Sequence, residues 1–281
     1  MPELPEVQTV VSDLRKSIRG WMVADFSSLW EKNVSAGMKI FKKEIFGAKI
    51  SDVKRKGKYI LIELDNSNVI VLHLRMTGAL IFDDERCNYE KIGHVRHCWV
   101  LKKGERKKEL LFSDVRKFAT VDLLFGEQRK GPRGLRMLGV DPLGQKFTAE
   151  FLGDLVCSYP KRTIRSILLD QDKISGIGNI YVSEILFAAK ISPLKETGKL
   201  NEKEVKMLCN STKKVLKKAI ELRGTTFSDY RDLRGERGSF QDRLKVYNRE
   251  HGRCSRRECS GVVLKEKIQG RSAFWCPKCQ K

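Results

Sequence analysis

The sequence of 281 residues predicts an α+β chain built from more than one domain. Three observations lead to this expectation. Apolar residues at helical spacing open the chain, and short runs with strand character then continue to about residue 125. Helical patterns fill much of the second half, and four cysteines cluster near the end. A helix with a β-sandwich or barrel, a helical domain and a small cysteine-rich hairpin would account for all three.

The first helix is expected over residues 3–19. Apolar residues recur there at intervals of three or four, namely at Val7, Val10, Val11, Leu14 and Ile18. The opening letters MPELPEV suit a helix start, because proline is favoured in the first turn and glutamate at the positive end of a helix. The same letters allow chemistry. Once Met1 is removed, Pro2 presents a free secondary amine beside two carboxylates.

The following hundred residues are expected to form short strands separated by turns. The clearest runs cover 58–64, 68–74, 97–102, 108–114 and 117–125. Residues 126–144 are rich in Gly, Pro and Arg and are interpreted as a linker. Helical patterns then cover 148–156, 162–171, 179–190 and 201–222. A glycine-containing turn, DKISGIGN, joins the second and third of these helices, which is a common arrangement in nucleic-acid-binding proteins. The charged segment 223–241 is expected to be a mobile loop.

The charge balance indicates a polyanionic partner. Lys and Arg number 56 against 35 Asp and Glu, which gives a net charge of +21. Nucleic acid is the leading candidate, with a membrane surface as the alternative. No run of apolar residues is long enough for a membrane span and no signal peptide is visible, so a cytosolic, DNA-associated protein is expected.

The terminal cysteines are expected to hold a metal. Cys254, Cys259, Cys276 and Cys279 form the pattern C-x4-C-x16-C-x2-C. Four thiolates in two close pairs suit one structural, tetrahedral Zn²⁺, and two disulfides are the alternative reading. The remaining cysteines are scattered and are expected to be reduced thiols, at Cys87, Cys98, Cys157 and Cys209.

Seven stretches together resemble the bacterial formamidopyrimidine-DNA glycosylase family. They are MPELPEV, GKYI (57–60), HLRMTG (73–78), DVRKF (114–118), SGIGNIYVSE (175–184), GTTFSDYRD (224–232) and GRSAFWCPKCQ (270–280). The resemblance spans the chain in order. It implies a β-sandwich with an N-terminal helix, a helix-two-turns-helix domain and a zinc finger, with duplex DNA as the partner of a monomer. It further implies excision of oxidised purines and then cleavage of the abasic site.

The resemblance also implies roles for individual residues. It makes Pro2 the nucleophile, Glu3 the neighbouring acid or base, and Lys58 a residue that reaches the lesion. It assigns Met76, Arg116 and Phe118 to the gap left by the everted base, and Asn179 and Arg271 to the flanking phosphates. His73 and Glu6 match positions that line the site. The domains it implies are 1–130, a linker at 131–148, a helical domain at 149–235 with a lesion-covering loop from about 223, and a finger at 236–281.

Each role has a structural alternative. Lys58 could be a solvated lysine at a strand end, and Glu6 only a partner of the helix dipole. Met76 and Phe118 could belong to the sandwich core, and Asn179 could be a helix N-cap.

The sequence departs from the family at the first cysteine pair, where C-x2-C is usual. The four residues SRRE between Cys254 and Cys259 enlarge this knuckle, and His251 becomes a possible substitute ligand. Four cysteine ligands remain the prediction.

Three other functions stay open. An endonuclease VIII-like enzyme would act on oxidised pyrimidines, although the wedge residues and MPELPEV favour purines. An inactive DNA-binding relative would not need Pro2, Glu3 and Lys58, and a zinc-ribbon transcription or RNA-binding factor would leave the N-terminal motif unexplained.

Overall fold

The computed structural model describes residues 1–82, 93–126, 131–227 and 230–281. Its residues group into two compact units. The first contains residues 1–136 and 222–241, and the second contains residues 137–221 and 242–281. The sequence analysis placed residues 223–235 with the helical domain and 236–241 with the finger, whereas here they pack with the N-terminal unit. None of the described helices is long and apolar enough to cross a membrane.

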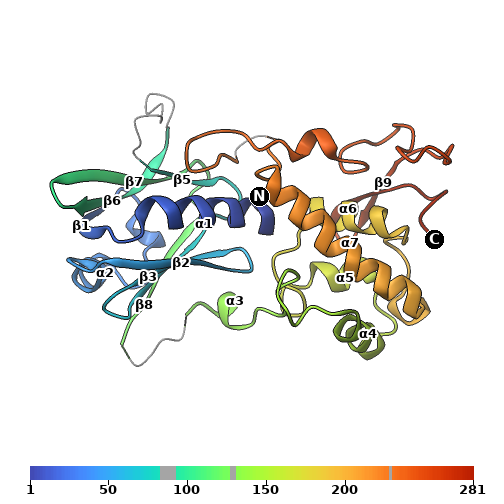
Figure 1. Ribbon diagram of the computed structural model, residues 1–281, viewed down its shortest axis with the longest axis horizontal. Coiled ribbons are helices and arrows are strands. Elements are labelled where there is room, and N and C mark those ends of the chain that lie inside the picture. The colour runs from blue at the N-terminus through green and yellow to red at the C-terminus, as the bar shows by residue number, and fades with distance from the viewer. Residues whose placement is uncertain (83–92, 127–130, 228–229) are drawn as a thin grey trace. The chain divides into compact units, whose positions relative to one another are not determined.

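The first unit is a β-sandwich with a helix against it (Figure 1). One antiparallel sheet has the order β1-β6-β7-β5 and the other has the order β2-β3-β4-β8. The strands are β1 (Met22–Ser28), β2 (Ile50–Lys56), β3 (Tyr59–Leu64), β4 (Val69–His73), β5 (Gly78–Phe82), β6 (Val95–Lys103), β7 (Arg106–Asp114) and β8 (Thr120–Leu124). All five predicted runs form strands. Because the strands belong to two separate sheets, the unit is a sandwich and not a barrel.

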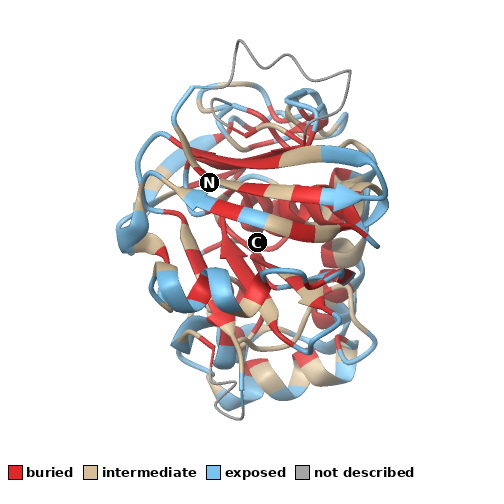
Figure 2. Ribbon diagram, turned by 90° about the vertical axis from the view of Figure 1, so that its left-hand side faces the viewer, coloured by how far each residue is buried: buried red, intermediate tan, exposed pale blue. Residues whose placement is uncertain are grey.

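Helix α1 (Leu4–Ile18) forms where the apolar spacing predicted it. Its apolar face joins the sandwich core, together with side chains of α2 and of both sheets, such as Phe41 of α2, Phe112 of β7 and Ile60 of β3. Figure 2 shows this buried interior between exposed outer surfaces. A short helix, α2 (Met38–Ile45), was not expected; it buries only Phe41 and Ile45. Two buried residues four apart give too weak a periodicity for a sequence-based prediction.

The second unit is mainly helical. Its helices are α4 (Ala149–Ser158), α5 (Ile164–Leu169), α6 (Asn179–Ala189) and α7 (Glu202–Glu221), and each begins and ends within two residues of its predicted bounds. The short α3 (Arg133–Arg136) of the first unit lies within the predicted linker. Short 3-10 helices of three or four residues cover Glu31–Asn33, Thr197–Lys199 and Phe240–Arg243.

Helix α6 is the centre of the second unit, since nine of its eleven residues are buried. Strands β9 (Leu264–Ile268) and β10 (Arg271–Trp275) form an antiparallel hairpin, and β10 packs on α6. The buried carboxylate of Glu184 accepts hydrogen bonds from the backbone N–H groups of Lys245, Val246 and Tyr247, each at 2.9 Å. These bonds fix the segment before the cysteine cluster to the helix.

Candidate active site and nucleic-acid interface

The start of α1 buries the residues predicted for catalysis. Pro2 is buried, Glu3 is 2% exposed and Glu6 is 1% exposed. Glu3 is the N-cap, and it forms a reciprocal capping box with Glu6, in which the Glu3 N–H donates to Glu6 Oε2 at 2.8 Å. The capping box therefore fixes the conformation of the chain directly after Pro2.

The second oxygen of Glu6 binds the segment 222–241. The Thr225 N–H donates to Glu6 Oε1 at 2.7 Å. Gly224 has φ +81°, and a Cβ there would come within 2.7 Å of the same oxygen, so only glycine fits the turn. Glu6 is thus more than a partner of the helix dipole: it joins the N-terminal turn to the GTTFSDYRD motif. The sequence flagged this motif but did not predict its neighbour.

Lys58 lies at the tip of the hairpin formed by β2 and β3. Lys56 pairs with Tyr59, so Gly57 and Lys58 make the two-residue turn. Lys58 is only 7% exposed, which contradicts the alternative of a solvated strand-end lysine. Arg55 donates to Gln8 Oε1 at 2.8 Å and to the Gly57 carbonyl at 3.2 Å, and so holds the tip beside the second turn of α1.

His73 is buried at the end of β4 in the same unit. Its Nδ1 accepts the Arg75 N–H at 3.0 Å, and its ring meets the Tyr59 ring edge-on with centroids 4.5 Å apart. Burial, then the charges of Arg75 and Lys58, lower the pKa of His73 to about 3. The imidazole is therefore neutral at physiological pH, and with Nδ1 accepting a bond, its proton is on Nε2.

Met76, Arg116 and Phe118 come together on the surface of the first unit. Met76 is 41% and Phe118 53% exposed, so neither belongs to the core, and the core alternative is wrong. The Arg116 guanidinium lies 4.9 Å from the centre of the Phe118 ring and donates to Met76 Sδ at 3.1 Å. Two apolar side chains and one cation thus form a single projecting cluster.

Asp114 holds the loop that carries this cluster. Its buried carboxylate accepts hydrogen bonds from the Thr77 hydroxyl, the Arg116 N–H at 3.2 Å and the Ala119 N–H at 2.8 Å. Lys117 adopts φ +58° within this loop. The DVRKF motif contains Asp114, but only the structure shows that this residue positions the loop.

In the second unit, Asn179 is the first residue of α6 and Gly178 is the N-cap, so the N-cap alternative for Asn179 is wrong. The Asn179 amide donates to the Ser272 carbonyl at 2.9 Å and accepts from Arg165 at 2.7 Å. Arg271 is exposed at the start of β10, directly after the hairpin turn.

Arg165 was not predicted, and it completes this group. It is 1% exposed, and burial and the nearby Arg271 charge lower its pKa. Two guanidinium groups and the N-terminus of α6 therefore gather next to Asn179, which is an arrangement that attracts anions. No sequence pattern marked Arg165, because it lies among the apolar residues of α5.

The four terminal cysteines converge as predicted. Their sulfur atoms all lie within 4.8 Å of one another, and in the described part of the chain His251 does not join this cluster. The pairs Cys254–Cys279 and Cys259–Cys276 have Sγ–Sγ distances of 3.7 Å. Tetrahedral Zn²⁺ with Zn–S bonds of about 2.3 Å would separate its sulfurs by about 3.8 Å, so this set fits the ion. Cys98, Cys157 and Cys209 are free thiols, and Cys87 lies outside the described residues.

The enlarged knuckle has a contact of its own. Arg256, which lies between the first two cysteines, donates to the carbonyl oxygens of Phe187 and Ala188 at the C-terminal end of α6. Its guanidinium also lies 4.5 Å from the centre of the Phe187 ring. A cation at the negative end of a helix is favourable, so Arg256 anchors the enlarged knuckle on α6.

Comparisons with known proteins agree with this arrangement. Residues 1–121 match the family model for the formamidopyrimidine-DNA glycosylase N-terminal domain, and residues 138–231 match the model for its H2TH domain. Formamidopyrimidine-DNA glycosylase of Pelotomaculum thermopropionicum is 38% identical over 282 residues, covering 100% of this chain and 99% of the relative. That of Prochlorococcus marinus strain SARG is 37% identical over 292 residues, with both chains covered fully.

A solved structure gives the same result. The complex between Lactococcus lactis Fpg and DNA containing an abasic site has a TM-score of 0.87 and 33% identity, with 99% of both chains covered. Two family models that together match most of the chain, with relatives of this identity over the full length, establish that the chain is a member of the formamidopyrimidine-DNA glycosylase family.

Proposed function

We propose that this DNA glycosylase excises oxidised purines, such as 8-oxoguanine and formamidopyrimidines, from duplex DNA and then cleaves the abasic strand through a Schiff base on Pro2. The observation that carries the proposal is the buried N-terminal turn, in which Pro2 precedes two buried carboxylates that are themselves fixed by hydrogen bonds. A reactive group must be held in place, and here the residues that follow Pro2 are fixed by the hydrogen bonds of Glu6 to the Glu3 N–H and to the Thr225 N–H.

The first step requires Pro2 to be the first residue, because with Met1 attached its nitrogen is an amide. The free amine attacks the anomeric carbon of the damaged nucleotide, and the bond to the base breaks. The ring then opens to an iminium ion, which withdraws electrons from the sugar. Loss of the adjacent sugar proton expels the 3′ phosphate, and a second elimination expels the 5′ phosphate.

Glu3 and Lys58 supply proton transfer in this proposal. A carboxylate next to the attacking nitrogen can carry protons and stabilise the iminium charge. A lysine on the buried tip of a hairpin can donate a proton to the leaving base or offset the charge of a leaving phosphate. The tip is attached to α1 through Arg55, so Lys58 keeps a fixed position relative to the helix.

His73 contributes as a neutral donor. Its pKa is about 3, so the ring is neutral, and its Nδ1 accepts the Arg75 N–H. The single N–H of the ring is therefore at Nε2. It can therefore donate one hydrogen bond without adding charge to the site.

The projecting cluster of Met76, Arg116 and Phe118 fills the place of the everted base. Apolar side chains replace lost stacking, and arginine can bond to the unpaired partner base. The anion-attracting group of the second unit, with Asn179 and Arg271, would hold the phosphates that flank the lesion. One structural Zn²⁺ on the four cysteines would keep the finger hairpin folded.

Borohydride trapping tests the proposal. The processed, monomeric protein is incubated with duplex containing 8-oxoguanine opposite cytosine, and with a duplex containing an oxidised pyrimidine. A covalent adduct on the purine duplex that is lost in Pro2→Gly and retained in Pro5→Ala is expected. No adduct and no strand cleavage on either duplex would refute the enzyme, and a preference for the pyrimidine duplex would refute the substrate assignment.

A further inference from the structure

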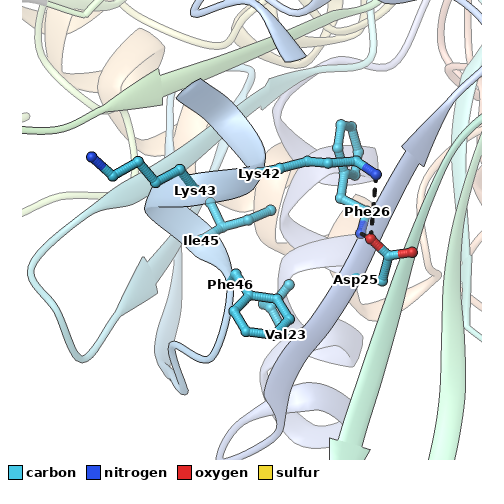
Figure 3. A pocket seen from close by; sticks show the side chains of 7 residues that line it. All are labelled: Val23, Asp25, Phe26, Lys42, Lys43, Ile45 and Phe46. Carbon is cyan, nitrogen blue, oxygen red and sulfur yellow. Dashed lines mark hydrogen bonds and ion pairs between the residues drawn. The ribbon is translucent and has the colours of Figure 1, made fainter. Parts of the chain in front are cut away.

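A hollow with an apolar floor lies on the outside of the first unit, between β1 and α2 (Figure 3). We call it the β1–α2 hollow. Its lining residues are Val23, Asp25, Phe26, Lys42, Lys43, Ile45 and Phe46, and its volume is about 310 Å³. This is at the small end of the range for ligand sites, which is about 300–1,000 Å³, so it has room for one or two side chains.

The floor of the hollow is apolar. Val23, Phe26 and Ile45 are each 1% exposed and form its base. Phe46, the C-cap residue of α2, is 70% exposed and lies beside Val23 at the edge (Figure 3). Burial of a phenylalanine side chain is worth about 1.5–3 kcal/mol, so a partner that covers this ring would gain binding free energy.

The rim is cationic. Lys42 lies 3.4 Å from Asp25, and Lys43 extends outward from the helix (Figure 3). The Phe26 N–H, followed by the charges of Lys42 and Lys107, holds the pKa of Asp25 below its usual value. The rim therefore carries two lysines, Lys42 and Lys43, against one carboxylate, Asp25, so its net charge is positive.

The hollow lies apart from the catalytic residues of its own unit. Pro2 precedes the first turn of α1, whereas Met22 and Val23 follow its last turn. A helix of 15 residues is about 22 Å long, so a molecule in the hollow would not touch the N-terminal amine. None of the lining residues is among those assigned to DNA or to catalysis.

These features identify one occupant. We propose that the β1–α2 hollow binds an acidic peptide segment of a partner protein, which inserts an aromatic or branched aliphatic side chain beside Phe46 and places its carboxylates on Lys42 and Lys43. A second copy of the chain fits poorly, because a symmetric contact would set the same lysines against each other. Duplex DNA offers phosphates to the rim but no apolar group to the floor.

Selection from a library of short random peptides tests the proposal on the full chain. The best peptides are then labelled, and their affinity is measured by fluorescence anisotropy for each variant. Sequences that combine Asp or Glu with one large apolar residue are expected. A chain of charge +21 attracts any acidic peptide, so dependence on Phe46 is the decisive observation.

The variants come in matched pairs. Phe46→Ala should weaken binding at least tenfold, whereas Leu29→Ala, which removes another exposed apolar side chain, should not. Replacing Lys42 and Lys43 together by Glu should also weaken binding at least tenfold. The same change at Lys203 and Lys206 on α7 controls for net charge. Cleavage of lesion DNA should stay unchanged in Phe46→Ala, which separates this site from the proposed catalytic function.

Three outcomes would overturn the proposal. They are a selection that yields no common acidic and apolar pattern, an affinity that Phe46→Ala leaves unchanged, and displacement of the peptide by undamaged duplex DNA from the Phe46 site. The last outcome would assign the hollow to nucleic acid.

Discussion

Replacing Asp114 by asparagine should destabilise the first unit and disorder its projecting cluster. The buried carboxylate accepts three hydrogen bonds, from the Thr77 hydroxyl and from the N–H groups of Arg116 and Ala119. Asparagine has the same shape but offers only one oxygen, so its NH₂ group must face at least one of these donors. A buried donor without an acceptor costs about 1–3 kcal/mol, and hydrogen bonds to a charged group are worth about 1.5–3 kcal/mol. The expected loss of unfolding free energy is about 2–4 kcal/mol.

Thermal unfolding followed by tryptophan fluorescence measures this loss, because Trp21, Trp30 and Trp99 all belong to the first unit. For a unit of this size, the midpoint should fall by roughly 5–15 °C. Asp122→Asn, on a strand surface of the same unit, is the control and should change little. Affinity for lesion DNA should fall with Asp114→Asn well below the melting temperature. An Asp114→Asn protein as stable as the control would refute the view that this carboxylate holds the loop.

Three further predictions concern other parts of the chain. Arg256→Ala should loosen the cysteine knuckle from α6 and speed up zinc release to a chelator severalfold, whereas Arg257→Ala should not. Equal release rates in the two variants would contradict the role of Arg256 as an anchor. Chelation of the metal, or Cys276→Ser, should abolish DNA binding while the first unit keeps its melting transition; retained DNA binding would show that the finger folds without metal. Burial lowers the pKa of His97 to about 4 in the folded protein. Below about pH 6.5 the unfolded chain therefore binds more protons at this residue than the folded chain does. The contribution of His97 should thus lower the free energy of unfolding by about 2 kcal/mol between pH 7 and pH 5. His97→Phe should reduce that pH dependence in urea unfolding, and an unchanged slope would mean that His97 is charged in the folded state.

The sequence alone determined most of the secondary structure and the grouping of the four terminal cysteines. Residues 3–19, the five strand runs and the four predicted helices of the second unit have strong periodicity, because each buries one face, or most of its surface, in a core. The cysteine cluster was equally clear, since ligand type and close pairing are local properties of the chain. The family motifs gave the candidate catalytic residues, and their catalytic roles remain proposals.

Only the tertiary structure decided which residues support these groups. Arg165 binds partners 14 to 107 residues away in sequence, and Asp114 binds the Thr77 hydroxyl 37 residues away. Glu6 binds Thr225 across 219 residues. It also showed that Phe118 is exposed and that Lys58 is buried, which reverses what each local pattern indicated. The reason is physical: exposure, hydrogen-bond partners and pKa depend on what distant segments place around a side chain, and no local sequence pattern contains that information.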